Sequence, residues 1–128
     1  MLHRERTLTV NSISDSAIVA ALGRQLNRAV ARQQVAASNL ANLDTPGYRA
    51  QDVRFAETLD ATLQTTGGGA DVPIVTETSG AAIRRDGNSV QVDREMLNMT
   101  RAAGDFSAAQ TALTAKFRLV RYAINEGR

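Results

Sequence analysis

The sequence contains no cysteine and no tryptophan, and only two of its 128 residues are proline. Without thiols, the chain cannot form disulfide bonds, thiolate nucleophiles or zinc–thiolate sites. Aromatic residues make up only 4% of the chain, so a core must be built from aliphatic side chains, which suits helix packing better than a β-sandwich. No apolar run approaches the ~20 residues that span a bilayer, and the N-terminal end lacks the apolar stretch of a signal peptide. We therefore expect no membrane-spanning segment and no cleaved signal peptide.

The sequence also lacks the side chains that most enzymes use. Its only histidine is His3, near the N-terminus, and the glycines at 67–69 lack the strand, lysine and helix of a phosphate-binding loop. We expect no catalytic activity, cofactor or metal site.

The charge is nearly balanced, with fifteen basic and thirteen acidic residues spread along the chain. A basic helical hairpin that binds nucleic acid is the alternative function, supported by Arg24, Arg28 and Arg32 on one predicted helix. There is no basic cluster and no interleaved aromatic residue, however, so this alternative has weak support. The hydrophobic content of 43% predicts one folded unit that spans residues 1–128.

Apolar residues at alternating spacings of three and four predict two long terminal helices. The first runs from about 13 to 43, with Ser12 and Asp15 as a capping box. It must end before Pro46, which has no N–H and disfavours helical geometry at the preceding residue. The second runs from about 94 to 125, with Asp93 as its N-cap.

The two helices are predicted to form an antiparallel, coiled-coil-like hairpin. Its intrachain seam consists of Leu22, Leu26, Leu40, Met99, Phe106, Leu113, Phe117, Val120 and Ile124. Between the helices, residues 44–91 are rich in glycine and predict an irregular, partly extended segment. Short extended pieces are expected at 53–55, 72–75 and 89–92, without a defined sheet. The predicted fold class is therefore mainly α.

The second helix is apolar on a further side as well. This outer face consists of small and apolar residues: Gly104, Ala108, Ala112, Ala115, Leu119 and Tyr122. Because a two-helix hairpin buries only one stripe per helix, the outer face predicts contacts with other subunits. The alternative is that the middle segment folds back and covers it.

The stretch Thr45-Pro46-Gly47 predicts a type II turn, in which proline presets φ and glycine supplies φ > 0. We expect Gly47 to aim Tyr48 away from the preceding helix.

In its wider context, "SNLANLDTPGYRAQDVRF" (residues 38–55) resembles the N-terminal signature of the flagellar rod, hook and hook-filament axial proteins, in which an Asn-rich helix end precedes Thr-x-Gly-Tyr. Arg49, Asp52 and Phe55, together with "VDREM" at 92–96 and "LVRYAI" at 119–124, are most similar to the proximal-rod proteins. Leu43 and Arg54 depart from that pattern, and residues 65–90 match no part of it.

The resemblance implies a structural subunit of the proximal rod of the bacterial flagellar basal body. Its terminal helices would pack side by side in a helical assembly, the axial drive shaft that transmits torque. The implied partners are other rod subunits, the rod-to-MS-ring junction protein and the flagellar type III export gate, and the implied location is the rod in the periplasmic space. The implied assembly motif is Asn39, Asn42, Thr45, Pro46, Gly47, Tyr48 and Arg49, with Tyr48 as an anchor and Arg49 as a donor to a neighbouring chain.

Overall fold

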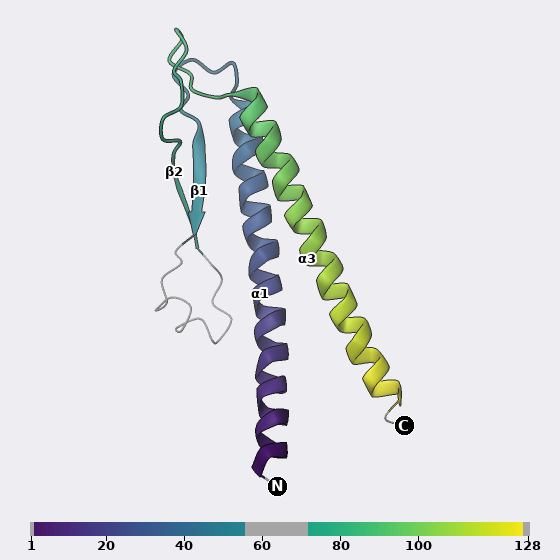
Figure 1. Ribbon diagram of the computed structural model, residues 1–128. Coiled ribbons are helices and arrows are strands. Elements are labelled where there is room, and N and C mark those ends of the chain that lie inside the picture. The colour runs from purple at the N-terminus through teal and green to yellow at the C-terminus, as the bar shows by residue number, and fades with distance from the viewer. Residues whose placement is uncertain (1, 56–71, 127–128) are drawn as a thin grey trace.

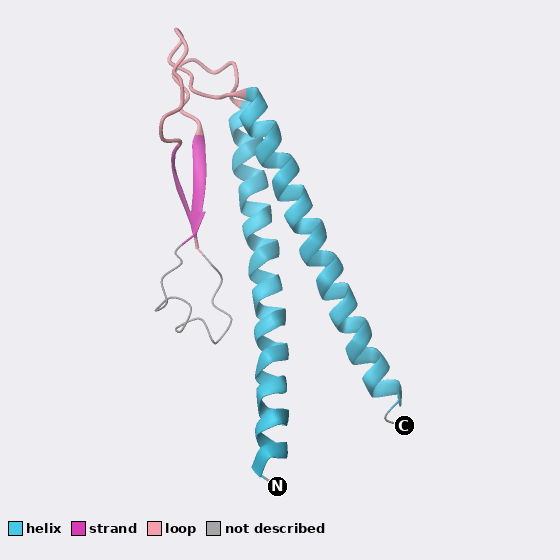
Figure 2. Ribbon diagram, in the orientation of Figure 1, coloured by secondary structure: helices cyan, strands magenta, loops and turns pink. Residues whose placement is uncertain are grey.

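The computed structural model describes the backbone of residues 2–55 and 72–126, and side chains within these ranges from residue 16 onward. The elements are α1 (Leu2–Ala41), β1 (Gln51–Phe55), β2 (Pro73–Glu77) and α3 (Val92–Glu126). Helices α1 and α3 run antiparallel, with both chain ends at the same end of the molecule (Figure 1). The strands lie beside α1, away from α3 (Figure 2). The predicted mainly helical hairpin is confirmed.

Helix α1 begins at Leu2 and not near residue 13, so Ser12 and Asp15 lie inside the helix and do not cap it. No glycine or proline occurs before Gly23, and nothing in that stretch stops a helix from extending. Its end at Ala41 lies before Pro46, as predicted.

The start of α3 also differs slightly from the prediction. The carbonyl of Gln91 accepts a hydrogen bond from the N–H of Glu95 at 3.1 Å, which makes Gln91 the N-cap in place of Asp93. Asp93 and Glu95 lie in the first turn, where negative charge is favoured by the helix dipole. No helix in the part of the chain that the structure describes is long and apolar enough to cross a membrane.

The middle segment forms a small antiparallel sheet in which Gln51 pairs with Glu77 and Val53 pairs with Val75. Extended structure was expected near both strands, but their pairing into a sheet was not predicted, and residues 89–92 do not form a strand. A two-stranded sheet is marginal alone. Here it is supported by α1, because Val53 is buried and the guanidinium groups of Arg28 and Arg32 lie 5.1 and 5.5 Å from the centre of the Phe55 ring.

The contact between the long helices is made by small residues. Ala29 and Ala36 of α1 and Ala102 and Ala109 of α3 are buried, and Ala36 and Ala102 line the same cleft. Both pairs of alanines are spaced seven residues apart, so in an antiparallel hairpin we infer that Ala36 lies opposite Ala102 and Ala29 opposite Ala109. Side chains of this size allow close approach of two helices.

The helices separate beyond these alanines, as Figure 1 shows. In the inferred register the next layer holds Leu22 and Lys116, which are much larger than two alanines. Both are half-buried. The change from small to large residues therefore accounts for the divergence toward the chain ends.

The predicted intrachain seam differs from the buried line of α3. Half-buried seam residues are Leu22, Leu26, Leu40, Met99, Phe106 and Leu113, whereas Phe117, Val120 and Ile124 are exposed. The buried positions of α3 are Glu95, Ala102 and Ala109, which lie at the edge of the predicted stripe. The spacing of large apolar residues identifies the broad face of the helix, but small residues determine where two helices come closest.

Candidate functional site

The turn after α1 has the predicted geometry. Gly47 has φ of 77°, and the N–H of Tyr48 donates to the carbonyl of Thr45 at 3.2 Å, so the type II turn is confirmed. The N–H of Gly47 donates to the carbonyl of Asp86 at 2.8 Å. A Cβ atom on Gly87 would lie only 3.2 Å from the Cα of Gly47, so the turn packs tightly against the segment that precedes α3.

Asn39, in the last turn of α1, connects this helix to the start of β1. Its side chain is completely buried. Its Nδ2 donates to the carbonyl of Gln51 at 2.8 Å, and its Oδ1 accepts from the N–H of Gln51 at 2.9 Å. The amide thereby occupies both backbone groups of Gln51, as a neighbouring strand would. It fixes the first residue of the strand against the helix.

The expectation that Tyr48 points away from the helix was wrong. Its hydroxyl donates to Oδ1 of Asn39 at 3.2 Å, and its side chain is half-buried. The physical reason is that the turn reverses the chain, so that β1 runs back alongside α1 (Figure 1). Tyr48 is therefore held by its own helix.

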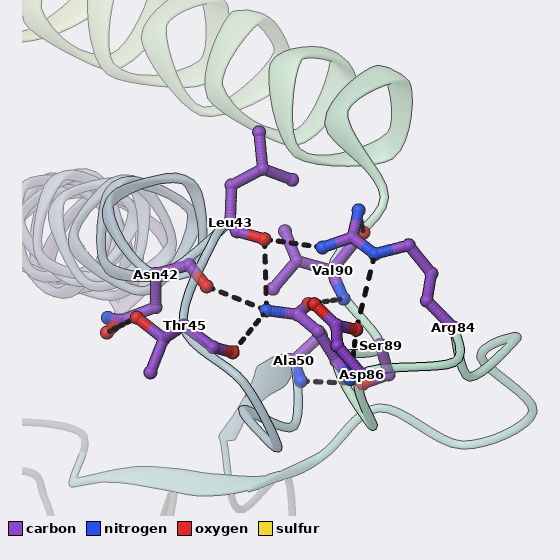
Figure 3. Close-up of polar contacts among 9 residues, drawn as sticks. Asn42, Leu43, Thr45, Ala50, Arg84, Asp86, Ser89 and Val90 are labelled. Carbon is purple, nitrogen blue, oxygen red and sulfur yellow. Dashed lines mark hydrogen bonds and ion pairs between the residues drawn. The ribbon is translucent and has the colours of Figure 1, made fainter.

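The carbonyl groups of the turn that follows α1 are bound by side chains from residues 84–90. The Nδ2 of Asn88 donates to the carbonyls of Asn42, Leu43 and Thr45 at 2.8, 3.0 and 2.8 Å, and the guanidinium of Arg84 also donates to the carbonyl of Leu43 (Figure 3). These carbonyls lie beyond Ala41, the last residue of α1, where the regular hydrogen bonds of the helix have ended. Asn88 and Arg84 supply donors to them from more than 40 residues away.

Asn42 adds a local cap. Its Nδ2 donates to the carbonyl of Ser38 at 2.8 Å, and its Oδ1 accepts from the hydroxyl of Thr45 at 3.2 Å. The two contacts tie the turn to the helix that it follows.

Residues 84–90, which we call the capping segment, are themselves held in shape. Oδ1 of Asp86 accepts from the N–H of Asn88 at 3.0 Å, and Oδ1 of Asn88 accepts from the N–H of Val90 at 2.8 Å. The hydroxyl of Ser89 accepts from the N–H of Ala50 at 2.8 Å. Arg84 and Asp86 also form an ion pair, at 3.8 Å between Nε and Oδ1, which contributes little because both side chains are well exposed.

The structure brings most of the predicted assembly motif into one network. Asn39, Asn42, Thr45, Gly47 and Tyr48 all take part through side-chain or backbone hydrogen bonds. Pro46 and Arg49 are exposed. Sequence reasoning missed the capping segment as their partner, although Asp86-Gly87 is a strong turn signal.

The outer face of α3 is exposed at all six predicted positions. Nothing in the described part of residues 44–91 covers it, and the strands lie on the other side of α1. A separate cleft of about 250 Å³ lies between α1, β1 and α3, with Arg32, Asp52, Arg101 and Asp105 at its walls. Among the described residues, no group of His, Asp or Glu is arranged to hold a metal ion.

Comparison with known proteins finds similarity to flagellar rod proteins. The family model for flagella basal body rod proteins matches residues 22–49, the second half of α1 and the turn. Over 122 residues the chain is 29% identical to flagellar basal body rod protein FlgB of Escherichia coli strain K12, a match that covers 80% of this chain and 88% of the relative. The chain is similar to flagellar basal-body rod proteins.

Other rod-family relatives agree. FlgB of Bacillus subtilis strain 168 is 26% identical over 119 residues, which covers 84% of this chain and 92% of the relative. FlgB of Salmonella typhimurium strain LT2 is 37% identical over 90 residues, which covers 55% of this chain and 65% of the relative. The part matched by the rod-family model contains Asn39, Asn42, Thr45, Gly47 and Tyr48, the residues that join α1 to the capping segment.

Proposed function

We propose that this chain is a structural subunit of the proximal rod of the bacterial flagellar basal body. The observation that carries the proposal is the match to FlgB proteins over most of both chains. The hairpin of two long helices supports it, because such a shape can pack lengthwise against copies of itself. The relatives lend no support to the nucleic-acid-binding alternative.

In this role the outer face of α3 contacts neighbouring subunits. Gly104, Ala108, Ala112 and Ala115 let a second helix approach closely, and Leu119 and Tyr122 add apolar area. All six positions are exposed in the single chain. Side-by-side contacts of this kind would give the rod the stiffness that torque transmission needs.

The turn at residues 45–48 and the capping segment, which together we call the junction, hold strand β1 at a defined angle to α1. The hydrogen bond between Tyr48 and Asn39 holds the start of β1 from within the chain. Arg49 remains exposed for a neighbouring chain. The assembly motif would thus act mainly by preparing one subunit's shape for contact with the next.

The remaining parts of the proposal follow from the family. The subunit has no catalytic activity and uses no cofactor. It is exported by the flagellar type III apparatus without a cleaved signal peptide and reaches the rod in the periplasmic space. Its partners are other rod subunits, the rod-to-MS-ring junction protein and the export gate.

The test is to locate the chain in intact basal bodies. A small tag on the N-terminal end, imaged in isolated basal bodies, is expected to lie between the MS ring and the distal rod. Cells that lack the chain should export other substrates but build no rod, and the wild-type chain should restore it. A label elsewhere would contradict the proposal, and salt-dependent DNA binding by the purified chain near physiological ionic strength would favour the alternative.

A further inference from the structure

The buried line of α3 begins with a carboxyl group. Glu95 is only 2% exposed and lies seven residues before Ala102, which lies seven residues before Ala109. This spacing places the three residues on one side of the helix, the side that packs against α1. Such a line normally holds apolar side chains, as it does at the two alanines. Glu95 is therefore a polar residue at a position where the packing of the hairpin favours an apolar one.

No hydrogen bond offsets the burial of one of its oxygens. The Oε2 atom of Glu95 is buried and has no hydrogen-bond partner among the described residues. A capping box would place the acidic side chain three residues after the N-cap, and with Gln91 as N-cap that position is Arg94. The helix dipole favours negative charge in this turn, but Asp93 supplies it from an exposed position. Neither form of capping therefore requires a buried carboxyl group here.

The surroundings of Glu95 include apolar side chains. Val90, which precedes α3, is buried, and Leu43 points from the turn after α1 toward α3 (Figure 3). In the register of the alanine layers, the next layer toward the turn pairs Leu43 with Glu95. A polar group buried without a hydrogen bond is less favourable than an apolar side chain of similar size. The layer that contains Glu95 is thus weaker than its position in the hairpin allows.

We propose that Glu95 is a built-in weak point that keeps the hairpin easy to unfold. This inference rests on the proposed function, in which the chain passes unfolded through the export apparatus. The junction and the alanine layers hold the hairpin together, because the helices diverge beyond them (Figure 1). A group that weakens this end lowers the free energy needed to open the whole chain. Buried polar groups without a partner can serve as such a reservoir of strain.

The first measurement is the stability of the purified full-length chain. Glu95→Met replaces the carboxyl group by an unbranched apolar side chain of similar size. We expect a higher urea midpoint in circular dichroism and a folded-to-unfolded ratio raised roughly 5- to 30-fold. Glu126→Met makes the same change at an exposed position of the same helix and should leave the midpoint unchanged. A midpoint of Glu95→Met at or below the wild-type value overturns the inference, because the carboxyl group would then support the fold.

The second measurement is the fraction of newly made chain that leaves the cytoplasm. Export of Glu95→Met should be severalfold slower than export of the wild-type chain. Ala109→Leu, added as a second change, should lower the stability again. The two sites are about 21 Å apart along the helix, so their effects should add, and the double variant should regain wild-type export.

The outcomes separate this inference from the rod function. Wild-type export of a stabilised Glu95→Met chain overturns the inference while the rod function stands. Slow export that persists in the double variant also overturns it, because Glu95 would then act by a route other than stability. A wild-type chain that is absent from rods overturns the proposed function and this inference with it.

Discussion

Two buried asparagines determine the shape of the junction. Asn39 pairs with both backbone groups of Gln51. Asn88 donates to three carbonyls of the turn after α1 and accepts from the N–H of Val90. Each side chain needs a donor at one end and an acceptor at the other. Only an amide of this length supplies both.

Replacement of Asn88 by aspartate removes the donor and keeps the shape. In Asn88→Asp, the carbonyls of Asn42, Leu43 and Thr45 lose their bonds to this side chain and face a carboxylate. The carbonyls of Asn42 and Leu43 keep other donors, the N–H of Thr45 and the guanidinium of Arg84, but the new carboxylate is buried against acceptors and has no donor there. A buried polar group left without a partner costs about 1–3 kcal/mol, so we expect a lower urea midpoint in circular dichroism. Asn125→Asp, at an exposed position of α3, is the matched control and should leave the midpoint unchanged. Equal midpoints for the two variants would show that Asn88 does not stabilise the junction.

Gly47→Val places a β-branched side chain at a φ of 77°. This conformation costs such a residue on the order of 1–3 kcal/mol. Under the proposed function the chain is exported unfolded, so rod assembly should fail while export continues. Gly23→Val is the control, since a Cβ there meets nothing within 4 Å and the φ is helical. Normal assembly of Gly47→Val, measured by motility and by rods in basal bodies, would remove the role assigned to the turn.

At the scale of elements, the sequence predicted the helices because their signal is local and repeated over many turns. It also predicted the end of α1, since Pro46 acts on its immediate neighbours. The strands were harder to predict because Val53 and Phe55 are stabilised by α1, not by nearby residues. The capping segment was missed for the same reason: Asn88 acts on carbonyls more than 40 residues away.

Two neighbouring alanines on α3 should separate folding from assembly. Ala109 is buried against α1, so Ala109→Leu forces extra volume into a close contact and should cost about 1–3 kcal/mol of stability in the isolated chain. Ala112 is exposed on the outer face, so Ala112→Leu should leave the urea midpoint unchanged but prevent motility. If Ala112→Leu cells swim normally, the outer face is not an interface between subunits.

At the scale of the whole molecule, the hairpin is thin and open at one end. The apolar side chains of α3 beyond Leu113 stay exposed, and so does Ile18 of α1. A shape of this kind buries too little surface to be stable over its full length by itself. Binding of neighbours would therefore supply much of the stability of the helix ends.

This uneven burial predicts a gradient of order along the isolated chain. Amide hydrogen exchange should be slowest near the junction, where Asn39, Asn88 and the alanine layers lie, and fastest in α3 beyond Lys116, because local opening there exposes little additional apolar surface. The purified chain should be monomeric, with less helix by circular dichroism than the structure contains, and should lose that helix gradually on heating.

In assembled rods the amides at the end of α3 should become protected from exchange. Asn88→Asp should remove the slow-exchanging region without changing the fast one. A sharp, cooperative melt of a fully helical monomer would contradict this picture, because the diverging ends would then be stable without neighbours.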